Sequence, residues 1–178
     1  MSGVKRMQPR EQIVALVMVG TKQRLWRCSQ VSGISITQLL EMSAPGFEQA
    51  TLERLKTFNP EQFPKNEKLY MQGRLTALEV YGRNRLAARK ILADAPRVVL
   101  SCKVTRQTKQ MLDRYCSFYA IPLAHLIYRM ANNWDKHVRA SLSPEHQQLF
   151  DNGKLTREML FPPPPAPDED DEENGSED

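Results

Sequence analysis

The chain has 178 residues and a formal net charge of +4, from 25 Lys and Arg against 21 Asp and Glu. Eight of the acids lie in Asp168–Asp178, so the rest of the chain sets 25 basic residues against 13 acidic ones. A basic surface attracts polyanions such as nucleic acid. The longest apolar run, Ile13–Val19, is too short to cross a bilayer and has no signal-peptide pattern. We therefore expect a cytoplasmic protein with no membrane partner.

Nothing in the sequence suggests catalysis, a metal or a cofactor. The three cysteines, Cys28, Cys102 and Cys116, have no Cys-x-x-Cys spacing, which argues against a disulfide framework and a zinc site. The chain also lacks a glycine-rich phosphate loop, a His-Glu-x-x-His motif and a nucleophile elbow. We expect a protein that is not an enzyme.

The N-terminal half is predicted to be helical. Residues 1–10 are expected to form a flexible basic N-terminus and residues 11–95 a helical domain, with apolar residues at helical spacing from Glu11 to about Met42. A break at Gly33 gives residues 24–42 the outline of a helix-turn-helix, although ordinary packing of two helices produces the same pattern.

Further helices are expected before residue 95. Pro45-Gly46 indicates a turn, followed by a short helix over residues 47–58. A long helix is expected from about Asn66 to Ala93. Its outer face would carry a set of cations, for which solvation and contact with a DNA backbone are both open readings. These cations are Arg74, Arg83, Arg85, Arg89 and Lys90.

The hydrophobic period changes from that of a helix to that of a strand after Pro96. Residues 98–104 alternate between two faces, with Val99, Ser101 and Lys103 on one of them. Thr105 can cap a helix over 106–119 with its hydroxyl group. Pro122 suits the first turn of a second helix, which would run to about His137.

A single strand requires a hydrogen-bonding partner, and no other strand is evident in the sequence. We therefore expect the strand to pair with its copy in a second subunit. The fold class is then mainly α, with a helical N-terminal region before a strand-helix-helix unit that forms a homodimer. The dimer core would contain the inward-facing apolar residues of this unit: Leu100, Cys102, Val104, Leu112, Leu126, Ile127 and Met130.

The succession of strand, capped helix, short turn and second helix over residues 97–137 resembles the ribbon-helix-helix family of the MetJ, Arc and CopG type. The resemblance implies that residues 97–138 form a DNA-binding and dimerisation domain. It also implies that Val99, Ser101 and Lys103 contact base edges in the major groove of double-stranded DNA.

The same resemblance implies a phosphate contact at the start of the second helix, formed by Pro122, Leu123 and Ala124. Here the chain departs from the family, which has Gly in the turn and Ser or Thr as the cap, because the sequence reads Ala120-Ile121-Pro122. Proline removes one amide donor. Three nearby cations could compensate: Arg97, Arg106 and Lys109.

The C-terminal part divides in two. Residues 143–160 are expected to form a helical extension, and residues 161–178 a Pro-rich and acidic disordered tail. The tail either serves only as a solvated segment or competes with DNA phosphates for the protein's own basic surface.

These features predict a sequence-specific transcriptional regulator that binds DNA, of the kind carried by plasmids, mobile elements and phage. An accessory factor of conjugative transfer or plasmid partition is the alternative, and an antitoxin-like interaction protein is a further one. The expected partners are double-stranded DNA, a second copy of the chain, and RNA polymerase or a relaxase.

Overall fold

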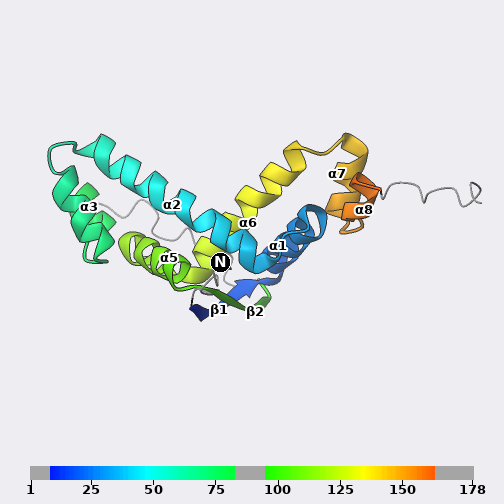
Figure 1. Cartoon of the computed structure of the whole chain (residues 1–178), viewed down its shortest axis with the longest axis horizontal. Helices are drawn as coiled ribbons and strands as arrows, with labels where there is room; N and C mark the ends of the chain where they lie inside the picture. The colour runs from blue at the N-terminus through cyan, green and yellow to red at the C-terminus, as the bar shows by residue number, and fades with distance from the viewer. Residues whose placement is uncertain (1–8, 83–94, 163–178) are drawn as a thin grey trace, which may run out of the picture.

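The computed structural model describes residues 9–82 and 95–162, which form a mainly helical molecule with one two-stranded sheet (Figure 1). The elements in chain order are β1 (Arg10–Met18), α1 (Val19–Ser32), α2 (Ile36–Phe58), α3 (Phe63–Met71), α4 (Ala77–Tyr81), β2 (Arg97–Thr105), α5 (Arg106–Tyr119), α6 (Leu123–Ala140), α7 (Pro144–Asp151) and α8 (Arg157–Leu160).

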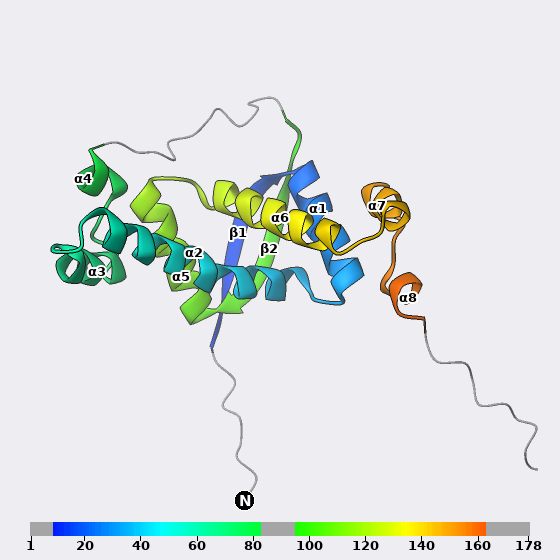
Figure 2. The same cartoon turned by 90° about the horizontal axis from the view of Figure 1, so that it is seen from above.

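The sheet is made within one chain. β1 and β2 pair in antiparallel register from Arg10 opposite Thr105 to Met18 opposite Arg97, and lie side by side beneath α2 and α6 (Figure 2). The prediction that the strand over residues 98–104 pairs with a second subunit is therefore wrong. Its backbone groups are paired with β1, so the unpaired strand no longer argues for a homodimer.

The helix predicted from Glu11 is also wrong over β1. Ile13, Ala15 and Val17 face the core and are buried, whereas Val14 and Leu16 face solvent. Because the outward positions are apolar too, the alternation typical of a half-buried strand is hard to see in the sequence. β2 has the same succession of buried and exposed positions, and there the prediction of a strand is confirmed.

The chain contains two copies of one strand-helix-helix arrangement. The N-terminal unit comprises β1, α1 and α2, and the C-terminal unit comprises β2, α5 and α6. Arg10 and Arg97 occupy equivalent positions in the two units, and so do the turn residues Gly33 and Ala120. The two residues of each pair are the same number of positions apart, so neither unit has an insertion relative to the other over this stretch. Both units carry the pattern Thr-Lys-Gln-x-Leu-x-Arg in the first helix, from Thr21 and from Thr108.

The two units are intertwined rather than stacked. α1 packs against α6 and α2 packs against α5, so each first helix lies on the second helix of the other unit (Figure 1). Equivalent ion pairs join them: Arg27 of α1 lies 3.6 Å from Asp135 of α6, and Arg114 of α5 lies 2.6 Å from Glu48 of α2. The described parts of residues 11–95 and 97–138, expected as successive domains, share one core.

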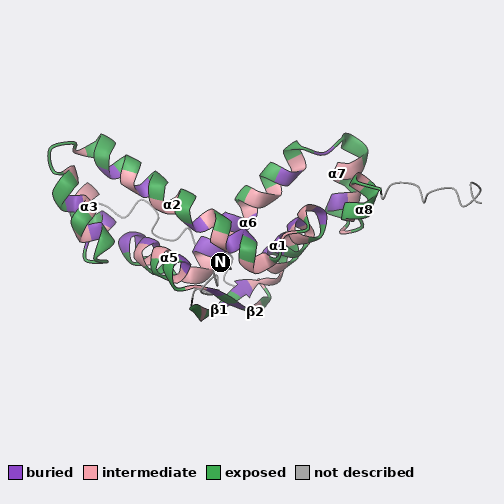
Figure 3. Cartoon of the chain, in the orientation of Figure 1, coloured by how far each residue is buried: buried purple, intermediate pink, exposed green. Residues whose placement is uncertain are grey.

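The core lies where α2 and α6 cross above the sheet (Figure 3). Leu39 and Leu126 occupy equivalent places there and are fully buried. The residues predicted for a dimer core are all buried, but inside one chain: Leu100, Cys102, Val104, Leu112, Leu126, Ile127 and Met130. Burial of this apolar surface is the main contribution to stability.

The helices between residues 42 and 82 differ from the prediction. α2 is continuous through Pro45, and residues on both sides of the proline are buried in the core. Within its described residues, 66–82, the long helix expected over residues 66–93 is interrupted, because α3 and α4 are separated by Gly73 with a φ of 68° and by the capping box of Thr76 and Glu79. Of its predicted basic face, Arg83, Arg85, Arg89 and Lys90 lie outside the described residues.

The predicted helices over 106–119 and after Pro122 are confirmed, and the Thr105 side chain accepts a hydrogen bond from the Thr108 amide as expected. The predicted C-terminal extension is helical in α7 and α8, and Phe150 buries its ring beneath Arg27 and Arg139. The expected flexible N-terminus and acidic tail lie, apart from a few residues at their edges, outside the described residues.

Candidate nucleic-acid interface

The outer face of the two-stranded ribbon formed by β1 and β2 is open to solvent. Every second residue of each strand points away from the helices, and the three apolar ones, Val14, Leu16 and Val99, keep 58%, 52% and 55% of their surface exposed. No helix of the described segments covers this face (Figure 1). Between the ends of the two strands, the six outward residues are Gln12, Val14, Leu16, Val99, Ser101 and Lys103.

The two ends of this outer face differ in chemistry. Gln12 lies opposite Lys103 at one end, and Leu16 lies opposite Val99 at the other. At the centre, Ser101 accepts a hydrogen bond of 2.9 Å from Gln12 Nε2. One half of the face therefore presents hydrogen-bonding groups and the other half presents aliphatic side chains.

Cations surround the ribbon. Arg10 Nη1 donates to the Lys103 carbonyl at 3.0 Å, and Lys22 Nζ donates to the Val99 carbonyl at 3.5 Å. Two residues predicted to contact phosphate already have acidic partners at 2.8 Å: Arg106 binds Glu11 and Lys109 binds Asp113. Surface pairs of this kind are weak, so either cation can exchange its carboxylate for a phosphate group.

The structure brings three of the predicted phosphate-site residues together at the apolar end of the ribbon. Arg97, Pro122 and Ala124 line a cavity of about 200 Å³ at the start of α6, which His125 also lines. The first turn of α6 has no side-chain cap, whereas Ser35 caps α2 through the amide of Gln38. Because the His125 amide bonds the Pro122 carbonyl at 2.9 Å, the start of α6 offers an anion no more free amides than the start of α2.

His125 adds no fixed charge to this cavity at neutral pH. Burial lowers the pKa of its imidazole, and the positive charge of Arg129 lowers it further. The cationic contribution there comes from Arg97.

Sequence reasoning found the outward residues of β2 and missed those of β1. Gln12, Val14 and Leu16 occupy the places in β1 that Val99, Ser101 and Lys103 occupy in β2. The repeated Thr-Lys-Gln-x-Leu-x-Arg pattern would have located them, because it follows both strands at the same distance. A search for internal repeats reveals such a duplication.

No protein-family model, curated protein or solved structure matches the chain. In the described parts of the chain, we find no group of side chains able to hold a metal ion. Among the helices of residues 9–82 and 95–162, none combines the length and hydrophobicity needed to span a membrane.

Proposed function

We propose that the chain is a sequence-specific DNA-binding regulator that places the ribbon formed by β1 and β2 in the major groove. The observation that carries the proposal is the solvent-facing two-stranded ribbon with cations around it. A two-stranded antiparallel ribbon fits the width of the major groove, where each base pair presents a distinct pattern of donors and acceptors. The arrangement is similar to that of a ribbon-helix-helix dimer, with both halves supplied by one chain.

Each outward side chain can contact a base edge in the major groove. Lys103 can donate to O6 and N7 of guanine, and Gln12 can form paired hydrogen bonds with N6 and N7 of adenine. Ser101 can donate or accept. Val14, Leu16 and Val99 can contact thymine methyl groups.

Because the two ends of the ribbon differ, the bound site is expected to lack two-fold symmetry. One half-site would be read through hydrogen bonds by Gln12 and Lys103. The other would be read through methyl contacts by Leu16 and Val99, with Arg97 and the start of α6 on the neighbouring phosphate groups. The location of the bound sites separates a regulator at promoters from an accessory factor at a transfer origin or partition locus.

Selection of binding sites from a random double-stranded DNA library tests the proposal. We expect the full chain to enrich one motif without two-fold symmetry. Lys103→Ala should relax the preference in one half of that motif and weaken binding by about 1–3 kcal/mol. Lys56→Ala, which removes an exposed cation on α2, is the control and should leave the motif unchanged. Enrichment of no motif by the wild type would refute the proposal.

A further inference from the structure

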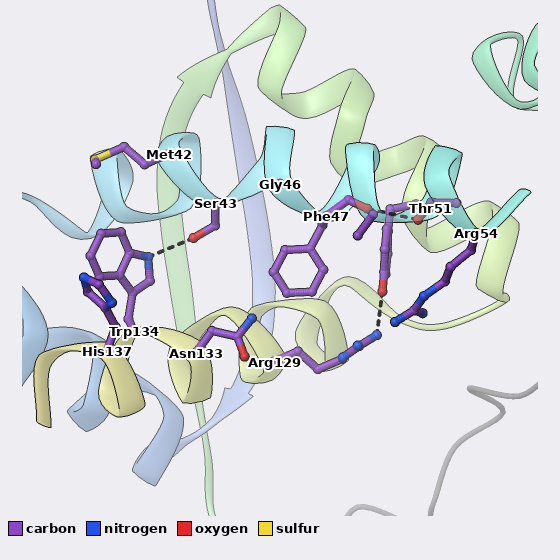
Figure 4. A pocket seen from close by; sticks show the side chains of 12 residues that line it. Met42, Ser43, Gly46, Phe47, Thr51, Arg54, Arg129, Asn133, Trp134 and His137 are labelled. Carbon is purple, nitrogen blue, oxygen red and sulfur yellow. Dashed lines mark hydrogen bonds between the residues drawn. The ribbon is translucent and has the colours of Figure 1, made fainter. Parts of the chain in front are cut away.

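A cavity of about 580 Å³ opens between α2 and α6, on the side of these helices away from the ribbon (Figure 4). Both units line it, with α2 on one wall and α6 on the other, and α5 contributes Tyr115 to the lining. Gly46 and Ala50 leave the α2 wall open, since a Cβ atom added at Gly46 would meet nothing within 4 Å. Pockets of this size hold small organic ligands in other proteins.

One end of the cavity is cationic. Arg54 and Arg129 point toward each other there, as Figure 4 shows. Arg129 Nη1 donates to the Tyr115 hydroxyl, and its guanidinium lies 5.5 Å from the centre of the Phe47 ring. Burial raises the pKa of Tyr115 to about 12, so its hydroxyl stays neutral and cannot offset these charges. Among the residues that the structure describes, no carboxylate lines the cavity.

The other end of the cavity is aromatic. The rings of Trp134 and His137 lie edge to face, with 6.1 Å between their centres. Trp134 Nε1 donates to Ser43 Oγ at 2.8 Å and to the Leu39 carbonyl at 3.1 Å, which fixes the indole ring in place. The Phe47 ring lies between the two ends (Figure 4).

We propose that this cavity binds a small organic anion that has an aromatic ring at one end and a carboxylate or phosphate group at the other. The ring would lie against Phe47 and Trp134. The anionic group would accept hydrogen bonds from Arg54 and from the N–H groups of Arg129 that Tyr115 does not use. Such a ligand would bridge the two units. The proposal does not depend on DNA binding and is tested without DNA.

Calorimetric titration of the full chain with four probes tests the charge and ring requirements. Indole-3-acetate is expected to bind. Neutral indole should bind at least about tenfold more weakly, because it cannot form the charged hydrogen bonds with Arg54 and Arg129. Acetate should also bind at least about tenfold more weakly, because it has no ring to bury against Phe47 and Trp134. Phenyl phosphate, compared with indole-3-acetate, shows whether the site favours a phosphate or a carboxylate group. Equal binding of indole and indole-3-acetate overturns the proposal, as does no binding of either anion.

Two variants then test whether the probe binds in this cavity. Ala50→Leu, at an exposed helical position, fills the space and should weaken indole-3-acetate binding by more than tenfold, a threshold that corresponds to about 1.4 kcal/mol. Arg54→Gln should weaken it about fivefold, while Lys56→Gln, a cation on α2 outside the cavity, should have no effect. An unfolding curve of each variant verifies the native fold. Unchanged binding by a folded Ala50→Leu variant overturns the proposal.

Discussion

The N-terminal and C-terminal units share a scaffold but present different surfaces. Equivalent residues build the core in both, and equivalent ion pairs, Arg27 with Asp135 and Arg114 with Glu48, tie each first helix to the opposite second helix. On the ribbon, however, Gln12, Val14 and Leu16 of one unit stand where the other has Val99, Ser101 and Lys103. Packing constrains the inward positions to apolar residues of similar size, whereas the outward positions have diverged.

Making the two strands alike on their outer face tests this difference most directly. The triple variant Gln12→Val, Val14→Ser, Leu16→Lys gives β1 the outward residues of β2. If the ribbon contacts bases, the variant should select a two-fold symmetric motif. It should also lose at least about a hundredfold in affinity for the wild-type site, since each base contact is worth about 1–3 kcal/mol.

The measurement is selection from a random DNA library, followed by titration of the wild-type site. The control is the unfolding midpoint, which should change little because the three positions face solvent. Selection of the unchanged asymmetric motif by the folded triple variant would show that the outward residues of β1 do not contact DNA bases.

The shared core predicts that damage to one unit unfolds both. Leu39→Ala and Leu126→Ala remove equivalent, fully buried side chains, and each should lower the free energy of unfolding by about 2–5 kcal/mol. Urea titration followed by circular dichroism and by tryptophan fluorescence should give one coincident transition for each variant. Trp26 in α1 and Trp134 in α6 make the fluorescence sensitive to both units. Separate transitions would indicate that the units fold independently.

The sequence was sufficient to predict the C-terminal unit. β2 follows a proline, has one clearly polar face with Ser101 and Lys103, and leads into a helix capped by Thr105. Each signal is local: a change of period, a hydroxyl cap and a proline at the next helix start. The predicted elements between Arg97 and Ala140 accordingly agree with the structure.

The same reasoning failed for β1 because the local sequence does not identify residues 10–18 as a strand. Val14 and Leu16 are apolar yet exposed, so residues 13–18 show no alternation of polar and apolar side chains, and their pairing with β2 identifies them as a strand. Tertiary contacts overrode local propensity there. The missing strand then led to the incorrect inference that β2 pairs with its copy in a second subunit. The cavity between α2 and α6 was also beyond prediction, since it depends on how distant helices cross.

The turns between the two helices of each unit offer a smaller test. Both turn residues adopt the left-handed conformation, Gly33 with a φ of 69° and Ala120 with a φ of 51°. The left-handed conformation costs a residue with a Cβ atom about 1–2 kcal/mol of conformational energy. Ala120→Gly should therefore raise the free energy of unfolding by about 1 kcal/mol, and Gly33→Ala should lower it by a similar amount.

Urea denaturation of these two variants measures the effect. At Gly33 the added Cβ would also lie 2.5 Å from Nη1 of Arg157, the end of a flexible side chain that can move aside. A loss of stability in Ala120→Gly would mean that the flexibility gained by the unfolded chain outweighs the relief of strain in the turn.

The smallest expected difference in stability between the two units arises at the start of the second helix of each unit, and this difference depends on pH. His125 of α6 stands where α2 has Gln38, which does not titrate. Burial and the Arg129 charge hold the pKa of His125 below its ordinary value of 6.5. The unfolded chain therefore takes up a proton first as the pH falls. The contribution of neutral His125 to the free energy of unfolding is complete above pH 6.5 and is lost as the pH falls below that value.

His125→Gln should reduce the loss of stability between pH 7 and pH 5. The effect should be smaller than that of Ala120→Gly or Gly33→Ala, because the His125 ring is partly exposed. Urea titrations of both proteins at the two pH values measure it, and an identical pH dependence would show that His125 titrates alike in the folded and unfolded chain.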